Sequence, residues 1–294
     1  MRKTILAATL FISAAAFAQQ DFSKVEVKAQ KVAGTVYMLT GAGGNIGVSV
    51  GDDGIVIVDD QYAPLAPKIK EALKAIADKP IKFVLNTHYH GDHTGGNETF
   101  GREAPVIAQT NVRKRLASGS HALGRDVPPA PKGALPVVTF DDKVSIFFNG
   151  EEIKAAHFPH GHTDGDSVIH FSGSNVVHMG DDFFNGTFPF IDVENGGGVK
   201  GMIAAGEKIL STMPDDVKII PGHGPLSDKA GLKAFDAMLR ETSAAVQKQI
   251  DEGKSLDDIQ KAKPLAEWAE KWGKGFINPE RFTAMLFDSI KAGR

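Results

Sequence analysis

Alternation of apolar and polar residues in the first third of the chain predicts a series of short β-strands. The alternating segments cover residues 35–39, 46–50 and 55–58, and turns rich in glycine and aspartate separate them. Residues 64–77 carry apolar side chains at helical spacing, which predicts a helix, and the short apolar run 81–85 predicts a buried strand. The chain is therefore expected to begin with hairpins, followed by a helix and a further strand.

Strand and helix patterns then alternate through the rest of the chain. Further strands are expected at residues 106–108, 144–148, 152–156, 168–171, 176–179 and 217–220. Helices are expected at residues 94–100, 199–210, 229–247 and 279–290. Residues 118–136 are rich in Pro, Gly and Ala and predict a long loop, and long loops in compact domains are often functional. This order of elements indicates an α/β (α+β) fold class, with two sheets in the middle and helices outside.

The N-terminus has the pattern of a secretory signal peptide. Met1-Arg2-Lys3 is positively charged, residues 5–17 are apolar and small, and Ala16-Phe17-Ala18 fits a cleavage site before Gln19. The apolar run is too short to span a bilayer, and the ordered zones disfavour the alternative of a buried N-terminal helix. We expect residues 1–18 to be removed and residues 19–294 to form a single domain, periplasmic or secreted, without a stable membrane anchor.

Composition narrows the class of protein and of partner. The net charge is −3 and no basic cluster stands out, which argues against nucleic acid and favours a small-molecule substrate. The chain has no Cys, so it can form no disulfide, offer no thiolate to a metal and carry no lipid-modified cysteine. Nothing in the sequence indicates an oligomeric state.

A histidine-rich stretch follows the strand expected at residues 81–85. "HYHGDH" places His88, His90, Asp92 and His93 within six residues. On extended backbone His88 and His90 point the same way, while Asp92 and His93, past the turn, can face a second point nearby. Four donors cannot complete two tetrahedral metal sites, so further donors are required from elsewhere.

Three later segments supply such donors, each shortly after an expected strand. They are "GHT" with His162, "GD" with Asp181 and "GHG" with His223. With "HYHGDH", in this order and at these intervals, they resemble the metallo-β-lactamase fold superfamily, from about residue 32 to the helix after His223. The resemblance implies a four-layer αββα sandwich. Asp181 is similar to the bridging aspartate of glyoxalase II-like members, whereas β-lactamases in the narrow sense carry Cys or Ser there.

The resemblance also implies a set of roles for these residues. Asp181 would bridge two metal ions, zinc by preference with Mn or Fe as alternatives. Asp59, at the end of "GIVIVDD", would support the histidine-rich loop by hydrogen bonding, a role that the neighbouring Asp60 could share. The first metal would be held by His88, His90 and His162, and the second by Asp92, His93 and His223.

These roles predict a dinuclear hydrolase. Two divalent cations lower the pKa of a shared water, and the resulting bridging hydroxide attacks a carbonyl-type bond, with Asp92 orienting it or relaying its proton. The bond would be an ester, lactone, thioester or amide, with a β-lactam included. An iron-dependent oxidoreductase resembling persulfide dioxygenases and a non-catalytic metal-binding protein are the alternatives. The roles of His121, His157 and His160 stay open.

Overall fold

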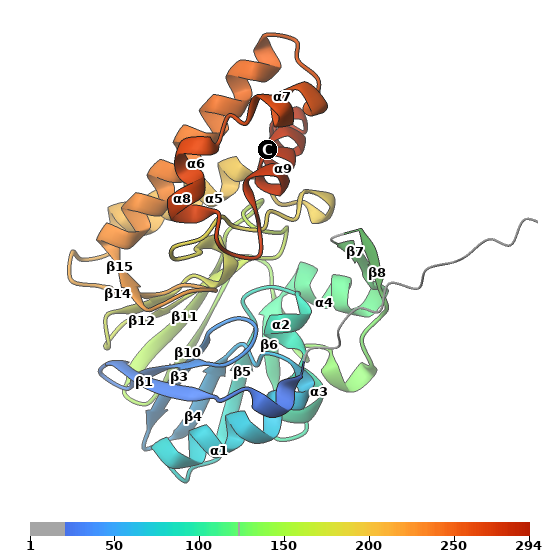
Figure 1. Cartoon of the computed structure of the whole chain (residues 1–294). Coiled ribbons are helices and arrows are strands. Elements are labelled where there is room, and N and C mark those ends of the chain that lie inside the picture. Colours follow the sequence, from blue (N-terminus) through green and yellow to red (C-terminus); the bar gives the residue numbers. More distant parts are fainter. Residues whose placement is uncertain (1–20, 123) are drawn as a thin grey trace, which may run out of the picture.

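The structure is a computed structural model that describes residues 21–122 and 124–294. Two β-sheets lie face to face in the middle, and helices cover the outer face of each sheet (Figure 1). The four-layer αββα arrangement expected from the sequence is therefore confirmed. The expected signal peptide at residues 1–18 lies outside the described residues.

The first sheet is built from the N-terminal half of the chain. Its order is β1 (Lys28–Ala33), β2 (Val36–Thr40), β3 (Ile46–Gly51), β4 (Gly54–Val58), β5 (Ile81–Leu85), β6 (Val106–Gln109) and β9 (Val138–Phe140). Strands β1 to β4 are joined as antiparallel hairpins. From β4 onward the neighbours run parallel, so β4, β5, β6 and β9 end at the same edge of the sheet.

The second sheet comes from the C-terminal half. Its order is β10 (Lys143–Phe148), β11 (Glu151–His157), β12 (Ser167–Phe171), β13 (Val176–His178), β14 (Lys218–Ile220) and β15 (Ser227–Asp228). Only β13 and β14 are parallel neighbours, so these two strands also end at one edge. A separate hairpin is formed by β7 (Ser120–Ala122) and β8 (Arg125–Val127).

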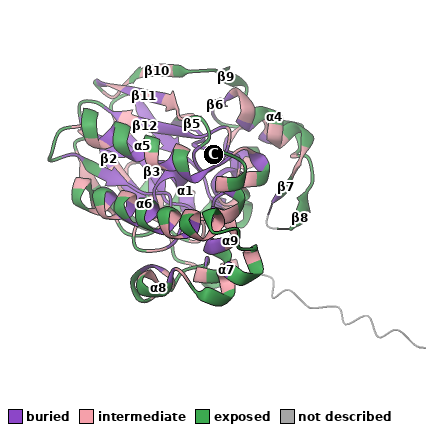
Figure 2. Ribbon diagram, turned by 90° about the horizontal axis from the view of Figure 1, so that it is seen from above, coloured by how far each residue is buried: buried purple, intermediate pink, exposed green. Residues whose placement is uncertain are grey.

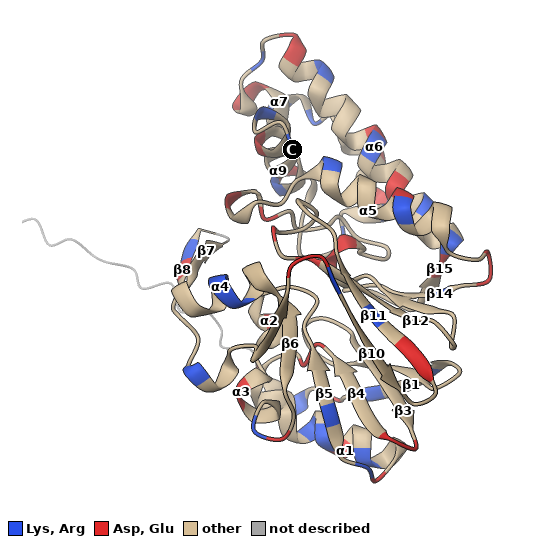
Figure 3. Ribbon diagram, turned by 180° about the vertical axis from the view of Figure 1, so that it is seen from behind, with Lys and Arg blue, Asp and Glu red and all other residues tan. Residues whose placement is uncertain are grey.

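Helices lie outside the sheets and at the strand ends. They are α1 (Ala66–Ile76), α2 (Gly91–Thr94), α3 (Asn97–Phe100), α4 (Thr110–Ser118), α5 (Val199–Thr212), α6 (Lys229–Asp251), α7 (Leu256–Ala262), α8 (Ala266–Trp272) and α9 (Pro279–Lys291). Within the described residues, no helix is both long and apolar enough to cross a membrane. Figure 3 shows that positions of acidic and basic residues alternate along the ribbon, most visibly on the outer helices.

Three apolar layers hold this arrangement together. The buried side chains between the two sheets come from both, for example Val56 and Leu85 from the first and Ile169 and Ile220 from the second. A second layer lies between the first sheet and α1, and a third lies between the second sheet and α5, α6 and α9. Figure 2 shows the buried positions gathered in the interior, with exposed ones on the outer helix faces. Continuous burial of this kind fixes the strand ends relative to one another.

Several expected helices and loops differ from the elements in the structure, and some strands and helices were not expected. The helix expected at 94–100 is instead two short helices, because α2 starts at Gly91, directly after the extended residue His90, and α3 starts only at Asn97. The expected loop 118–136 contains the hairpin β7–β8, whose residues are mostly exposed and therefore show no apolar alternation. Strand β1 and helix α4 were missed for the same reason, since α4 buries only Val112. The pattern also did not indicate β9, α7 and α8.

Candidate metal centre

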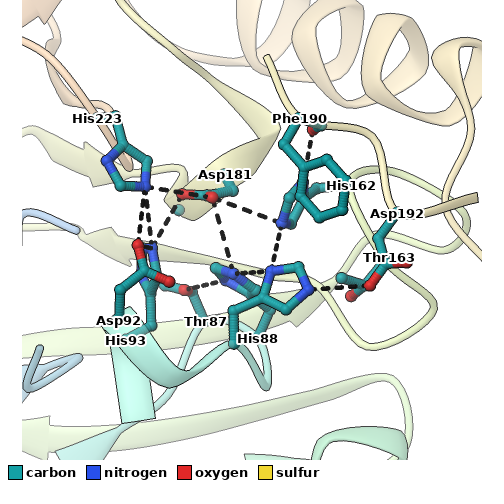
Figure 4. Close-up of polar contacts among 12 residues, drawn as sticks. Thr87, His88, Asp92, His93, His162, Thr163, Asp181, Phe190, Asp192 and His223 are labelled. Atoms are coloured by element: carbon teal, nitrogen blue, oxygen red, sulfur yellow. Dashed lines mark hydrogen bonds and ion pairs between the residues drawn. The ribbon is translucent and has the colours of Figure 1, made fainter. Parts of the chain in front are cut away.

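The seven predicted donors converge at one edge of the two sheets. His88 and His90 follow β5, and Asp92 and His93 lie in the single turn of α2. His162 lies between β11 and β12, Asp181 follows β13, and His223 follows β14. Because β4, β5, β13 and β14 all deliver their carboxyl ends here, residues far apart in sequence become neighbours (Figure 4).

The donors form two groups within which the donor atoms lie no more than 4.8 Å apart. The first group is His88, His90, His162 and Asp181, and the second is Asp92, His93 and His223. The structure therefore brings together all seven residues named from the sequence, in the two sets that the resemblance implied.

Hydrogen bonds to the outer ring nitrogens fix the tautomers in the first group. His90 Nε2 donates to Asp192 Oδ2 at 2.9 Å, and His162 Nδ1 donates to the Phe190 carbonyl at 2.8 Å. The Thr87 hydroxyl donates to Asp59, so its oxygen accepts from His88 Nδ1 at 3.0 Å. The proton of each ring thus points outward.

The inner nitrogens of these three rings consequently face one another as bare lone pairs. His90 Nδ1 lies 2.8 Å from His162 Nε2 and 3.1 Å from His88 Nε2. Three acceptors at such distances repel unless a cation lies among them. Neutral imidazole nitrogens beside a carboxylate are the donor set that Zn²⁺ and related divalent ions prefer, so these residues fit a metal ion.

Asp181 connects the two groups. Its Oδ2 lies 3.5 Å from His162 Nε2 and 3.4 Å from His223 Nε2, while its Oδ1 lies 3.1 Å from His93 Nε2. Figure 4 shows the carboxylate between the two sets of rings. The side chain is buried, and Oδ1 makes no hydrogen bond of good geometry, which is the environment expected of a carboxylate that binds cations.

The protonation states of the first group suit metal binding near neutral pH. Burial lowers the pKa of His88 well below its usual range and lowers the pKa of His162 to about 4. Burial alone would raise the pKa of Asp181, but the surrounding imidazoles of His223, His93, His162 and His88 outweigh burial and lower it well below its usual range. His88 and His162 are therefore neutral and Asp181 ionised, as metal ligands must be.

In the second group, carboxylates lie close to two imidazole rings and favour their protonated forms. Asp92 Oδ2 lies 3.3 Å from His223 Nε2 and 3.7 Å from His93 Nε2. Burial would lower the pKa of both imidazoles, but Asp181 and Asp92 outweigh burial, raising the pKa of His223 to about 9 and that of His93 well above its usual range. Without a metal, these rings hold protons where a cation would bind.

Asp59 and Asp60, which the sequence could not separate, have different contacts. Asp59 accepts from Thr87 N, Thr87 Oγ1 and His93 Nδ1, each at 2.7 Å. Asp60 Oδ1 accepts from Gly96 N at 2.8 Å, and its Oδ2 has no hydrogen-bond partner. Asp59 is thus the residue that supports the histidine-rich loop, and it orients His93.

Two glycines allow the backbone to approach the donors closely. A Cβ built at Gly44 would lie 2.1 Å from His93 Cε1, and one built at Gly222 would lie 2.0 Å from Asp181 Oδ1. Any side chain at either position would displace a donor. The turns before β3 and after β14 therefore depend on glycine to complete the site.

Aromatic rings form one wall of the centre. Phe184 stacks on His223 with centroids 5.0 Å apart, and Phe190 lies 5.6 Å from His90 and 5.5 Å from His162. Phe183 and Phe188 lie in the core instead, so the phenylalanines after Asp181 divide between the core and this wall. A pocket of about 250 Å³ adjoins Phe190 and is also lined by Asp192, by Gly124 beside β8 and by α9.

Of the other five histidines, four have polar partners outside the donor groups. His178 is buried and its Nε2 contacts the Asn45 carbonyl, while His170 is half-buried on β12. His157 Nδ1 contacts the Asp166 carbonyl, and exposed His160 Nδ1 contacts the Gly196 carbonyl. His121 is exposed in the hairpin and pairs with Asp126. None of the five belongs to either donor group.

The sequence reasoning missed Asp192, which lies 102 positions from its partner His90. It also missed Asn195 and Arg115, which contact one another and, through Asn195, Asp192. The only sequence signal was the polar turn "DVENGGG" after an apolar run close to Asp181. That signal indicates a turn without indicating what the turn contacts.

Comparison with known proteins identifies a family model and several hydrolases that resemble this chain. A family model described as the metallo-beta-lactamase superfamily matches residues 39–223. A hydroxyacylglutathione hydrolase of Nitrosococcus oceani is 33% identical over 153 residues, 51% of each chain. A probable hydroxyacylglutathione hydrolase of Schizosaccharomyces pombe is 29% identical over 197 residues, 64% of this chain and 67% of that protein. The matches span about half to two thirds of the length of these relatives.

Solved structures share the fold at lower identity. A metallo-beta-lactamase from Pontibacter korlensis superposes with a TM-score of 0.61 at 18% identity, covering 73% of this chain and 99% of that one. A double mutant of the sec-alkyl sulfatase PisA1 superposes with a TM-score of 0.67 at 16% identity, covering 89% of this chain and 50% of that one. At these identities the likeness shows the fold alone.

Proposed function

The chain belongs to the metallo-beta-lactamase superfamily, and on this premise we propose that it is a metal-dependent hydrolase of a small molecule with a carbonyl-type bond. The observation that carries the proposal is the pair of donor groups joined by Asp181. The bond is an ester, lactone, thioester or amide, and the relatives named as hydroxyacylglutathione hydrolases support an acyl bond. We further propose that the protein is exported, on the signal-peptide pattern of residues 1–18.

We assign two zinc ions to the two groups, with Mn or Fe as alternatives. His88, His90 and His162 would hold one ion, and Asp92, His93 and His223 the other, with Asp181 shared. When bound, two such cations acidify water and stabilise negative charge on a substrate oxygen. A mononuclear iron oxidoreductase would leave the second group without a role, so the full donor set favours the hydrolase.

The protein's own residues supply orientation and proton transfer. Asp92 lies at the mouth of the second group with its side chain 22% exposed, whereas Asp181 is 5% exposed. Burial would raise the pKa of Asp92, but His93 and His223 outweigh burial and lower it to about 2, so it is ionised and can accept a hydrogen bond from water. We propose that Asp92 orients the attacking water or relays its proton, while Phe184 and Phe190 limit access of bulk water.

The nature of the bridging residue weighs on the choice of substrate. β-Lactamases in the narrow sense resemble this site but for Cys or Ser at the bridging position, where this chain has Asp181. The chain has no Cys to take that place. We therefore rank acyl esters, thioesters and lactones above β-lactams, and include a β-lactam in the test.

The test is an activity screen of zinc-loaded mature protein on chromogenic esters, thioesters, lactones and a cephalosporin. We expect turnover of at least one acyl substrate, about two metal ions per chain by elemental analysis, and a loss of kcat of at least 100-fold in Asp92→Ala. His170→Gln, which changes a half-buried histidine outside both groups, serves as the control and should retain wild-type turnover. One iron per chain with oxygen consumption, or no turnover on any substrate, would contradict the proposal.

A further inference from the structure

We propose that Asp192 is a positioning residue that holds His90 in the tautomer with a free Nδ1, and that Asn195 and Arg115 hold Asp192 in place for this purpose. The inference rests on the proposed function insofar as the first group binds a cation. It concerns residues that neither the sequence pattern nor the donor groups single out.

Asp192 contacts the first group in two ways. Its Oδ2 accepts from His90 Nε2 at 2.9 Å, and its backbone N donates to the His162 carbonyl at 2.9 Å. His162 in turn donates its Nδ1 proton to the carbonyl of Phe190, two residues before Asp192. One short segment after Asp181 therefore orients two of the three rings that share the first group.

Burial shields the hydrogen bond between Asp192 and His90 from water. Asp192 is 2% exposed, and the His90 side chain is 14% exposed. Water cannot readily replace the carboxylate as the acceptor of the Nε2 proton. Because neutral imidazole carries a proton on only one nitrogen, an acceptor at Nε2 keeps Nδ1 bare, and Nδ1 is the atom that faces His88 and His162.

Asn195 holds the carboxylate from the other side. Its Nδ2 lies 2.8 Å from Asp192 Oδ1 and 2.9 Å from Asp192 Oδ2. The Arg115 guanidinium donates to Asn195 Oδ1 at 2.6 Å, which fixes the amide so that its nitrogen faces Asp192. Asn195 Nδ2 also contacts the His121 carbonyl at 2.7 Å, so the same amide attaches the β7–β8 hairpin.

Arg115 is itself held in a fixed orientation. Its Nε and Nη2 atoms donate to the two carboxylate oxygens of Asp164 at 2.8 and 2.7 Å, and Asp164 N donates to the Asn195 carbonyl at 3.1 Å. Paired contacts of this kind restrict the guanidinium more than a single ion pair would. The chain of contacts thus runs from α4 through Asn195 and Asp192 to His90.

Replacement of Asp192 by Asn removes the charge and leaves the shape. The amide can accept from Nε2 more weakly, or turn its NH₂ toward Nε2 and shift the ring proton to Nδ1, where it blocks the donor atom. Either change weakens binding at the first group. Loss of a hydrogen-bond partner to a metal-binding histidine typically lowers metal affinity about 10–100-fold, and we expect a decrease in that range.

The experiment measures zinc affinity of metal-stripped, full-length mature protein by competition with a chromogenic chelator. Asp192→Asn should bind zinc at the first group about 10–100-fold more weakly than wild type. Asp126→Asn removes the carboxylate of the exposed His121 pair and serves as a matched control, with wild-type affinity expected. The absorption spectrum of the Co²⁺-loaded protein should change in Asp192→Asn and stay unchanged in Asp126→Asn.

A second variant and an NMR measurement test the role of Asp192 independently of the folding of Asp192→Asn. Asn195→Ala should weaken zinc affinity at the first group about 3–10-fold. If Asp192→Asn does not fold, this variant tests the role of Asp192 in its place. Ring-nitrogen NMR of the metal-free wild type should show His90 protonated at Nε2, which tests the inference even if the protein binds no zinc and the proposed function fails. A folded Asp192→Asn with wild-type affinity and an unchanged His90 tautomer would overturn it.

Discussion

At the scale of single residues, two adjacent acids in this protein have different hydrogen-bond partners. Asp59 and Asp60 are both fully buried, yet Asp59 receives three hydrogen bonds and Asp60 one. Asp59 also has a φ of 65°, a left-handed conformation that aspartate tolerates better than most residues. Burial raises the pKa of Asp60 well above its usual range, which favours the protonated form of this side chain.

These environments predict different effects of the same substitution. Asp59→Asn would turn an NH₂ toward atoms that are themselves donors and should lower the free energy of unfolding by about 1–3 kcal/mol. Asp60 accepts a single hydrogen bond, which an asparagine oxygen can also accept, so Asp60→Asn should change the free energy of unfolding by less than about 0.5 kcal/mol. Urea unfolding of both variants measures the difference. An equal decrease in the free energy of unfolding for both variants would show that the three hydrogen bonds to Asp59 add no stability beyond the single bond to Asp60.

Protons on the second group predict pH-dependent metal binding. His93 and His223 have raised pKa values without metal, that of His223 being about 9, and a cation must displace their protons. The pKa values of His88 and His162 are lowered, so these ligands are already neutral at pH 7. Affinity for the second ion should therefore rise between about pH 6 and pH 9, and affinity for the first should change less.

Calorimetry in buffers of different ionisation enthalpy measures the protons released at each step. We expect the second binding event to release more protons than the first. Equal and small release in both events would mean that His93 and His223 are neutral before the metal binds.

At the scale of elements, the buried and periodic segments could be predicted from the sequence and the exposed ones could not. Strand β4 is buried along its whole length, and α5 buries one face, so both have clear apolar patterns. Strand β1 pairs with β2 at the edge of its sheet and exposes most of its residues, so only backbone hydrogen bonds define it. The seven donors could be named because their motifs follow expected strands and together resemble one family pattern, whereas Asp192 lies in a turn whose contacts depend on the fold.

Helix α9 packs one side against the core and lines a pocket with another side. Phe282 and Leu286 pack into the core, while Arg281, Ala284, Met285 and Asp288 line the pocket beside Phe190. Positions 281, 284, 285 and 288 share one side of a helix. The pocket is lined by Phe190, which lies beside His90 and His162, so we expect α9 to influence which substrates reach the centre.

A large side chain on this face should restrict substrate size. Ala284→Trp is expected to raise KM about tenfold for the bulkiest substrate accepted, with little effect on the smallest. Zinc content should stay at the wild-type value, since Ala284 contacts no donor in either group. The kinetic constants over a series of acyl chain lengths measure this. Equal changes for all chain lengths would place the substrate elsewhere.

At the scale of the whole molecule, the centre joins the two sheets. The loop after β5 belongs to the first sheet, and His162, Asp181 and His223 belong to the second. Apolar packing holds the sheets together in their middle, and the donor groups do so at one edge. A cation bound there stabilises the folded state because the unfolded chain has no assembled site.

Removal of metal should consequently lower the melting temperature. A ligand at 100 times its Kd stabilises by about 2.7 kcal/mol, which for a chain of this size corresponds to a decrease of about 5–10 °C on removal. Calorimetric scans with and without a chelator measure the shift, and added zinc should restore it. Asp181→Ala should show little response to the chelator. A wild-type melting temperature that does not respond would show that the sheets dock independently of the ions.

The separation of the donors along the chain has a consequence for the order of assembly. His93 and His223 are 130 positions apart, and the strand that delivers His223 is among the last to join its sheet in sequence order. During synthesis a growing polypeptide can gather His88, His90 and Asp92 early, yet the second group stays incomplete until β14 has emerged and docked. Contacts across such distances form slowly, so full metal occupancy reports that folding has finished.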